Sequence, residues 1–311
     1  MSSTPPIPSP LFLVAAPRSG AETLRQMLAL HPAIAMASEF DFLVDAISSE
    51  GRFMKRDAFL RSVEFNIRFK RLGLTVPPGT PFTGIAQAML EQVAATKPGA
   101  PIVGAVLQRH FDRILWLWPD ARFIHLVRDG RDVAQATVAS RRAGNLWHGI
   151  AGWVDAEVLW DRMSHKLPAE RQLSLRYEVL ASDTSYELQR ICEFLGLPFD
   201  PAMLGPAQAL HREPTGRWRK ADIAELSAAE HRAARWLLQN GYFLSATVRP
   251  PAILRRTALH IQNKLTLANH RRELLGTGAW LKSVYTARFG RKKAKSRLKR
   301  EQAELMARSD D

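Results

Sequence analysis

The alternation of apolar and polar positions predicts that the chain opens with a strand, a tight turn and a helix. Leu11–Ala16 is a continuous apolar run between prolines, which is typical of a parallel strand buried on both faces. Pro17–Gly20 interrupts this run. Apolar residues then recur at helical spacing until His31-Pro32, at Leu24, Met27, Leu28 and Leu30. This order of elements is typical of a nucleotide-binding α/β unit.

The same pattern returns near the middle of the chain. The apolar run Arg122–Val127 ends at a polar turn, Arg128–Asp132, and helical spacing resumes after it, at Val133, Ala136, Thr137 and Ser140. Ligands of open α/β sheets gather at the carboxyl ends of the strands, which is where both turns are expected. Two such turns on neighbouring strands would suit a ligand that carries phosphates at both ends.

The remaining pattern supports the same fold class. Further strands are predicted over 101–106 and 172–177, and helices over 187–197 and 228–240, with glycines at or just after their ends. Residues 51–99 show no clear period, and we expect mixed helix and loop there. We therefore predict an α/β fold of three layers, in which a central parallel sheet lies between helices on both faces.

Charge divides the chain into a nearly neutral body and a basic tail. The net charge is +14, and residues 251–311 contain 15 Lys and Arg against 5 acidic residues. We expect a body over residues 1–250 and a basic helical tail over 251–311, with two amphipathic helices broken near Gly276–Gly278 and then the basic run Arg291–Arg300. A solvated extension or an oligomerisation arm is the favoured role of the tail. Contact with an anionic membrane comes next, and nucleic acid is the least favoured partner.

The protein is expected in the cytoplasm, with the membrane surface as an alternative site. A single cysteine, Cys192, excludes an intramolecular disulfide and favours a reducing compartment. Met1–Pro10 has no basic residue ahead of the apolar stretch, so it does not resemble a signal peptide. No uninterrupted apolar run approaches the ~18 residues that span a bilayer.

The first turn has the residue types of an anion site. Unpaired N–H groups at the start of a helix attract anions, Gly20 permits close approach, and the forked guanidinium of Arg18 suits phosphate or sulfate oxygens. The pattern G-x4-G-K-[ST] is absent, and no Gly-Lys dipeptide occurs in the chain. This argues against an ordinary P-loop ATPase or kinase.

Five segments together resemble the sulfotransferases that use 3′-phosphoadenosine 5′-phosphosulfate (PAPS). Pro17–Gly20 resembles their 5′-phosphosulfate loop, and Arg122–Val133 resembles their strand and 3′-phosphate motif. The similarity continues in the same order through Leu175–Leu180, Ile191–Leu197 and Gly216–Arg219, and covers roughly residues 11 to 243. The resemblance implies a P-loop-like sulfotransferase fold that transfers a sulfuryl group from PAPS to a hydroxyl or amine, with no metal.

The resemblance also implies roles for individual residues. The 5′-phosphosulfate would be held by the first loop, and Arg18 would also act in catalysis. The residues of that loop are Arg18, Ser19, Gly20, Ala21, Glu22 and Thr23. Arg128 would hold the 3′-phosphate, Tyr177 would lie near the adenine, and Arg212 would close over the 3′-phosphate.

The chain departs from the family pattern at several of these positions. Ala21 and Glu22 stand where two Thr or Ser residues are usual, and a carboxylate beside a polyanion should repel it. Ser19-x-x-Glu22 is also a capping-box pattern, in which the turn would merely start a helix. A usual serine is replaced by Ala136, for which Ser140 is the nearest substitute. The strand over 101–106 lacks the usual lysine, and only Arg109 and His110 lie nearby.

The candidate catalytic base is Glu39, which follows the first helix where several sulfotransferase groups place a glutamate. The alternative is a surface or capping carboxylate after Ser38, and Asp41 is a less favoured base. His125 is interpreted as structural, and Trp147, Trp153 and Trp160 as core residues rather than an acceptor wall. No histidine pair has metal-ligand spacing.

Three functions remain open from the sequence. The leading hypothesis is a sulfotransferase for a carbohydrate, a lipid or another small molecule. A second is a catalytically impaired nucleotide-binding scaffold on the same fold, targeted by its basic tail, and this reading gains if Glu22 faces the phosphates. Kinase activity is third, because the Gly-Lys pair is missing.

Overall fold

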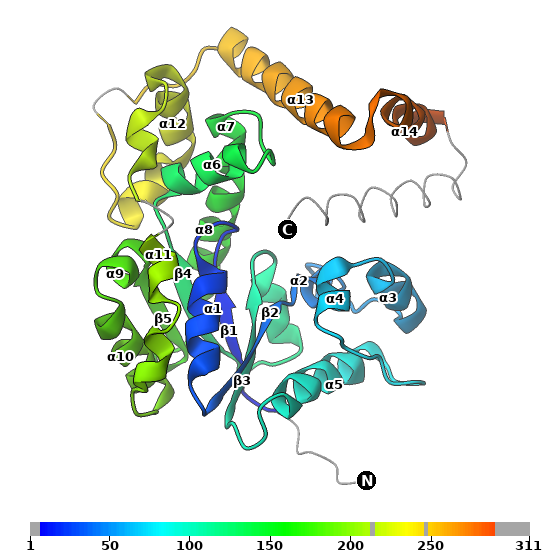
Figure 1. Cartoon of the computed structure of the whole chain (residues 1–311), viewed down its shortest axis with the longest axis vertical. Coiled ribbons are helices and arrows are strands. Elements are labelled where there is room, and N and C mark those ends of the chain that lie inside the picture. Colours follow the sequence, from blue (N-terminus) through cyan, green and yellow to red (C-terminus); the bar gives the residue numbers. More distant parts are fainter. Residues whose placement is uncertain (1–6, 212–214, 246–247, 290–311) are drawn as a thin grey trace.

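The computed structural model describes residues 7–211, 215–245 and 248–289, and it contains a five-stranded parallel sheet (Figure 1). The strand order is β2-β3-β1-β4-β5. The strands are β1 (Leu11–Val14), β2 (Ile34–Glu39), β3 (Ile102–Leu107), β4 (Arg122–Val127) and β5 (Gln172–Arg176). Because β1 is central and its neighbours β3 and β4 flank it, the turns that follow β1 and β4 meet at one edge of the sheet.

Side chains of β1 alternate between two apolar layers, as the two-residue period of a strand requires. Leu11 and Leu13 belong to one buried cluster, whereas Phe12 and Val14 belong to the other. The first cluster lies under helices α1 (Ala21–Leu30), α9 (Tyr177–Ser182) and α10 (Thr184–Leu195), and also involves α11 (Ala207–His211) and the short 3-10 helix Pro201–Leu204.

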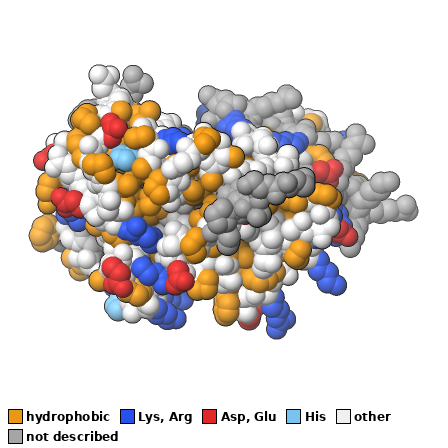
Figure 2. All heavy atoms as spheres, turned by 90° about the horizontal axis from the view of Figure 1, so that it is seen from below, with side chains coloured by type: hydrophobic (Ala, Val, Ile, Leu, Met, Phe, Trp, Pro, Cys, Tyr) orange, Lys and Arg blue, Asp and Glu red, His pale blue; other side chains and the backbone are white. Residues whose placement is uncertain are grey.

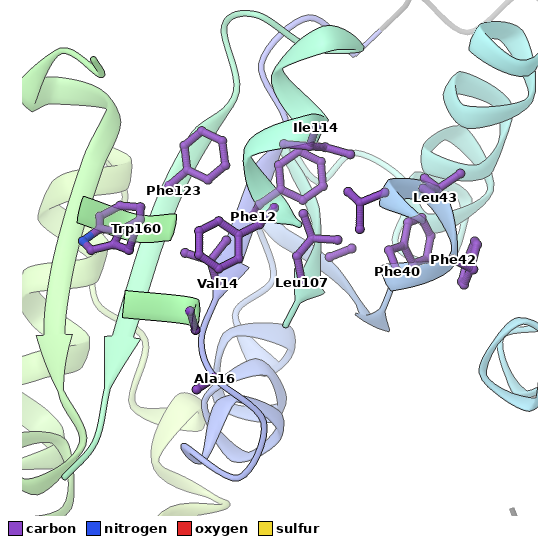
Figure 3. Close-up of a cluster of buried hydrophobic side chains, with 14 of the residues drawn as sticks. Phe12, Val14, Ala16, Phe40, Phe42, Leu43, Leu107, Ile114, Phe123 and Trp160 are labelled. Atoms are coloured by element: carbon purple, nitrogen blue, oxygen red, sulfur yellow. The ribbon is translucent and has the colours of Figure 1, made fainter. Parts of the chain in front are cut away.

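The second layer is larger and covers the opposite face of the sheet. Figure 3 shows Phe12, Val14 and Phe123 of the strands packed between Trp160 and a group that includes Phe40 and Ile114. The helices of this layer are α2 (Asp41–Val44), α5 (Phe82–Ala95), α6 (Gly130–Ala139), α7 (Leu146–Gly149), α8 (Ala151–Ser164) and α12 (Ile223–Gln239), with a 3-10 helix over Phe111–Trp116. The three-layer prediction is therefore confirmed.

Most predicted elements are present, with two informative differences. The sequence pattern did not predict β2, which forms one edge of the sheet. The segment without a clear period contains α3 (Arg56–Val63), α4 (Ile67–Arg71) and the fourteen-residue α5. Both differences lie beside the candidate base Glu39, at the end of β2.

The two predicted tail helices form, and the first of them packs on the body. They are α13 (Ile253–Leu275) and α14 (Thr277–Phe289), separated by Gly276 at φ 74°. Leu259 of α13 is buried, and its carbonyl accepts a hydrogen bond of 2.7 Å from Asn145 Nδ2. Asn263 Oδ1 accepts another of 2.7 Å from the N–H of Gly144, which places α13 beside α7 (Figure 1). The basic run Arg291–Arg300 lies outside the described residues.

Two surface features complete the fold. On the face seen in Figure 2, acidic and basic side chains are interspersed, in keeping with the nearly neutral charge of the body. Within the described ranges, no helix has the combination of length and apolar composition needed to cross a bilayer.

Candidate functional site

The turn after β1 has a backbone that depends on glycine. Arg18 and Gly20 have φ angles of 71° and 90°, and Gly20 is the N-cap of α1. A Cβ on Gly20 would lie 2.5 Å from Cε2 of Tyr177, so no side chain fits there. The turn therefore packs directly against the ring of Tyr177, at the start of α9.

Ser19 places a buried hydroxyl in this turn that makes no hydrogen bond to the described residues. The residue is 1% exposed, and Ser19 Oγ has no hydrogen-bond partner among the described residues. No side chain caps the start of α1, so the capping box suggested by Ser19 and Glu22 does not form. Because buried hydroxyls are normally paired, Ser19 has the hydrogen-bonding capacity that a ligand in the turn would use.

Glu22 binds a cation of its own helix. Its carboxylate accepts hydrogen bonds from Arg25 Nη2 at 2.6 Å and from Arg25 Nε at 2.9 Å. The side chain of Glu22 is 51% exposed, so water and Arg25 both screen its charge. The repulsion expected between Glu22 and a bound polyanion is therefore reduced. Ala21 is buried and Thr23 is half-buried in the same helical turn.

The turn after β4 brings Arg128 to the same place. Arg128 is 3% exposed, and its Nη1 donates to the carbonyl of Arg18 at 3.1 Å. Its guanidinium lies 4.4 Å from the centre of the Tyr177 ring, on the residue that also supports Gly20. The structure thus brings together Arg18, Ser19, Gly20, Arg128 and Tyr177.

Tyr177 is itself almost fully enclosed. It is 1% exposed, and its hydroxyl donates to the carbonyl of Leu210 at 3.0 Å. With Gly20 and Arg128 also against it, Tyr177 supports the two turns and has little surface left for an adenine. Arg212, two residues after Leu210, lies outside the described residues.

The other charged residues of the second motif hold a later segment of the chain. Asp132 accepts hydrogen bonds from the N–H groups of Gly216 at 2.6 Å and Trp218 at 3.1 Å. The guanidinium of Arg131 lies 3.5 Å from the Trp218 ring centre and also pairs with Asp129 and Glu230. The sequence pattern did not predict these tethers, which join the first turn of α6 to the 3-10 helix Arg217–Lys220.

Ser140 lies far from the second turn. It is the C-cap of α6, and its hydroxyl donates to the carbonyl of Thr137 at 3.1 Å. Ten helical residues, about 15 Å of helix, separate it from the start of α6 beside Arg128. The structure therefore does not bring Ser140 to Arg128.

Glu39 lies in a cluster of charged side chains at the end of β2. The strand has an irregular register between Ala37 and Glu39, and the Glu39 carboxylate pairs with Arg68 of α4. The neighbouring Asp41 is buried and accepts hydrogen bonds from the N–H of Gln108 at 2.8 Å and from Arg109 Nη1 at 3.0 Å. The expectation of a solvent-facing or capping carboxylate does not match this half-buried ion pair.

Burial shifts the pKa values of the two carboxyl groups, Glu39 and Asp41, in this cluster. It raises the pKa of Glu39, and the pKa of Asp41 is raised for the same reason. Arg68 opposes the shift for Glu39, while the charge of Asp41 adds to it. A carboxyl with a raised pKa accepts protons better than an ordinary one at neutral pH, which suits a general base.

The Arg109 guanidinium binds two carboxylates. Besides Asp41, it donates through Nε to Asp45 Oδ1 at 2.9 Å. These contacts give it a structural place in the acidic cluster. A role in replacing the missing lysine of β3 would require both carboxylates to release it.

His125 and two of the three tryptophans pack in the core. His125 stacks on Trp160 with ring centres 4.5 Å apart and lies 3.4 Å from Glu157. Trp153 and Trp160 are buried, as expected, whereas Trp147 is half-buried and contacts the guanidinium of Arg232. Among the residues whose placement is described, no cluster of three metal-ligating side chains is found.

Comparison with known proteins places these features in context. Residues 10–201 match the sequence model of the sulfotransferase family. A protein-tyrosine sulfotransferase of Drosophila melanogaster is 23% identical over 215 residues, which is 66% of this chain and 41% of that protein. An uncharacterised protein of Aquifex aeolicus is 26% identical over 222 residues, which is 64% of this chain and 27% of that protein. The chain thus spans less than half the length of these curated relatives.

Two solved structures share the fold. The sulfotransferase domain from the curacin biosynthetic pathway has a TM-score of 0.52 at 19% identity, covering 76% of this chain and 99% of that domain. The sulfotransferase domain of the Synechococcus PCC 7002 olefin synthase has a TM-score of 0.51 at 21% identity, covering 81% and 92%. At these identities the likeness concerns the fold alone.

Proposed function

Because the chain belongs to the sulfotransferase family, we propose that it transfers a sulfuryl group from PAPS to a hydroxyl or amine of an acceptor. The observation that carries this proposal is the meeting of Arg128 and the Gly20 turn on one buried ring, that of Tyr177. A buried cation and an unsatisfied hydroxyl, supplied by Arg128 and Ser19, fit a ligand with an anion at each end.

Each residue then has a chemical task. The backbone N–H groups that start α1, together with Arg18 and Ser19, would hold the 5′-phosphosulfate, and Arg128 would hold the 3′-phosphate. In the transfer, the acceptor oxygen or nitrogen forms a bond to sulfur while the bond from sulfur to the bridging phosphate oxygen breaks. The electron pair of that bond stays on the phosphate, and nearby guanidinium groups stabilise the added charge.

Glu39 takes the proton that the acceptor loses. Its raised pKa and its position at the carboxyl end of β2, the edge where ligands of α/β sheets gather, support this role. The Arg68 side chain that pairs with it must leave or shift when the acceptor hydroxyl approaches. Arg68 therefore holds Glu39 in place between reactions.

The acceptor belongs to one of a few chemical classes. A carbohydrate, a lipid or another small molecule with a hydroxyl or amine fits the reaction, and the Drosophila relative adds the phenol of a protein tyrosine. The alternative of a non-catalytic scaffold would gain if Glu22 faced the phosphates. Since Glu22 pairs with Arg25, this feature does not favour the scaffold hypothesis.

Calorimetric titration of the full chain with 3′-phosphoadenosine 5′-phosphate tests the donor site directly. We expect saturable binding that weakens at least about ten-fold in Arg128→Ala, because a desolvated charge-assisted contact contributes about 1.5–3 kcal/mol. AMP, which lacks the 3′-phosphate, should bind similarly weakly. Arg128→Lys keeps the charge and separates loss of contact from loss of fold.

The matched control is Arg61→Ala, which removes an exposed arginine of α3 and should leave the affinity unchanged. Turnover is then followed as release of 3′-phosphoadenosine 5′-phosphate from PAPS in the presence of acceptors, with Glu39→Gln expected to abolish it. Absence of nucleotide binding at millimolar concentration in a folded protein would reject the proposed function.

A further inference from the structure

The two helices of the tail carry a large share of the exposed apolar surface of the molecule. In the part of the chain that the structure describes, fifteen large hydrophobic side chains are exposed, and eight of them lie in α13 and α14. These helices have only 23 and 13 residues. Exposed apolar residues that gather in this way mark a surface that meets a partner or a membrane. None of the steps of sulfuryl transfer described above uses this surface.

The exposed apolar side chains of α14 lie on one face of the helix. Val284, Tyr285 and Phe289 follow Leu281 by three, four and eight residues, which is the spacing of a single helical face. They are 47–67% exposed, and the ring centres of Tyr285 and Phe289 lie 5.3 Å apart. The face is therefore a continuous apolar strip, and tyrosine adds a hydroxyl of the kind found where a membrane meets water.

Helix α13 adds a second apolar row, on the side that faces away from the body. Leu254, Ile261 and Leu265 are 85%, 52% and 60% exposed, and they follow one another at intervals of seven and four residues. The opposite side carries the buried Leu259 and Asn263, which is hydrogen-bonded to the loop before α7. Because these contacts fasten one side of α13 to the body, the apolar row is held outward (Figure 1).

The charge around both rows is almost entirely positive. The two helices contain seven Lys and Arg, the run Arg291–Arg300 contains seven more, and Glu273 is the one acidic residue over 253–300. Glu273 forms an ion pair with Arg141 of the body, so its charge is compensated there. Exposed cations of the two helices are Lys264, Arg271, Arg272, Lys282 and Arg288.

These properties together select one kind of partner. A second copy of the chain would bring two sets of cations together, since a symmetric contact pairs a surface with itself. A nucleic acid would use the cations but would leave the apolar rows without a partner, because its interfaces are polar. A bilayer that contains anionic lipid uses both, since its acyl region takes up apolar side chains while its headgroups attract Lys and Arg.

We propose that α14 and the outward side of α13 form a docking surface for the anionic face of a lipid bilayer. The two helices lie along the bilayer surface, the apolar rows enter the boundary between headgroups and acyl chains, and the cations bind the headgroups. Because α13 is fastened beside α7, docking also holds the body at the bilayer. Docking does not require sulfuryl transfer, so its failure and the failure of the proposed function are separate results.

Sedimentation of the full chain with lipid vesicles tests the apolar rows. We expect saturable binding to vesicles of phosphatidylcholine and phosphatidylserine in equal parts. Leu281→Ser/Tyr285→Ser should weaken it at least about ten-fold, because two side chains no longer enter the bilayer. The matched control, Leu238→Ser/Tyr186→Ser, removes the same residue types from α12 and α10, where they are 54% and 52% exposed, and should bind as the unaltered chain does. An unchanged Tm shows that each variant is folded.

The same assay tests the charge. Vesicles of phosphatidylcholine alone should bind at least about ten-fold more weakly than the mixed vesicles, and Lys282→Gln/Arg288→Gln should weaken binding to the mixed vesicles by a similar factor. Arg61→Gln/Lys70→Gln removes two exposed cations of α3 and α4 and is the matched control, which should bind normally.

Three results would overturn the proposal. Equal vesicle affinity of Leu281→Ser/Tyr285→Ser and its control would show that lipid binds through the basic run or another surface. Equal affinity for the two kinds of vesicle would show that anionic lipid is not recognised. If the mixed vesicles do not bind, while duplex DNA binds or Leu281→Ser/Tyr285→Ser dissociates a dimer, the surface belongs to nucleic acid or to a second copy of the chain.

Discussion

The protonation of Glu39 depends on the neighbours that β2 and α4 bring to it. Burial raises its pKa, the Arg68 guanidinium lowers it, and the carboxylate of Asp41 raises it again. A general base works only in its ionised form, so activity should fall as the pH drops through the raised pKa. The acid limb of the pH profile should therefore lie above the ordinary range of a glutamic acid.

Replacing Arg68 moves this limb in a predictable direction. In Arg68→Gln the largest influence that lowers the pKa of Glu39 is gone, so the pKa rises further and the acid limb shifts to higher pH. The measurement is kcat/KM for PAPS against pH. Lys70→Gln, on an exposed residue of the same helix, is the control and should leave the limb in place. An unshifted limb in Arg68→Gln would show that Glu39 is not the group that titrates.

At the residue scale the sequence placed the two turns on neighbouring strands but left their contacts unpredicted. In the structure Arg128, Tyr177 and the turn at Gly20 lie in contact. The sequence did not predict that Asp132 binds the N–H groups of Gly216 and Trp218, because partners more than eighty residues apart leave no local pattern. Ser140 was expected to take the place of the serine that is missing at Ala136, yet the full length of α6 separates it from Arg128.

The first turn of α6 acts as an anchor for the segment Gly216–Lys220. The Asp132 carboxylate accepts hydrogen bonds from the N–H groups of Gly216 and Trp218, and the Arg131 guanidinium packs on the Trp218 ring. This segment follows residues 212–214, which lie outside the described residues, and contains one of the five stretches that resemble the sulfotransferase family. None of Arg217–Lys220 is buried, so the position of the segment depends on a few polar contacts more than on buried apolar area.

Asp132→Asn should loosen this segment. The amide keeps one acceptor oxygen but loses the charge, which weakens hydrogen bonds that contribute about 1.5–3 kcal/mol when charged. We expect faster tryptic cleavage at Arg217, Arg219 and Lys220 and weaker binding of 3′-phosphoadenosine 5′-phosphate. Asp155→Asn, on an exposed carboxylate of α8, is the control. Equal cleavage rates in the two variants would contradict the anchoring role.

Among the elements, β2 and the segment before β3 were the hardest to predict. Ile34–Glu39 is rich in Ala and Met and ends in two polar residues, and Ile34 is the one residue in it of the β-branched and aromatic types that favour strands. The helices α3 and α4 have eight and five residues, too few for a clear helical period. Since these elements carry Glu39 and Arg68, the surroundings of the candidate base were less predictable than the two turns after β1 and β4.

At the scale of the whole molecule, the tail is partly integrated with the body. Leu259 is buried against the body, and α13 is bonded to Gly144 and Asn145. Its opposite side leaves Leu254, Ile261 and Leu265 exposed. Contact of that side with an anionic bilayer stays a prediction, as does the boundary at residue 250.

Removing the tail should destabilise the body. Loss of one buried leucine costs about 1.5–3 kcal/mol, and each kcal/mol lowers the Tm by roughly 2–4 °C in a domain of this size. We expect calorimetry to give a Tm several degrees lower for residues 1–250 than for the full chain. The control ends after Phe289 and keeps both helices. If the two shortened chains melt at the same temperature, the packing of α13 contributes no stability.

The strand order also decides when the protein can fold during synthesis. The central strand β1 leaves the ribosome first, yet Leu11 pairs with Gly104 on one side and Arg122 on the other. At about 5–20 residues per second, roughly a hundred further residues take on the order of 5–20 s to appear. Throughout that delay one of the most apolar segments of the chain has no partner strand. Contacts this distant in sequence form slowly, so the nascent chain is a natural client for chaperones that shield exposed strands.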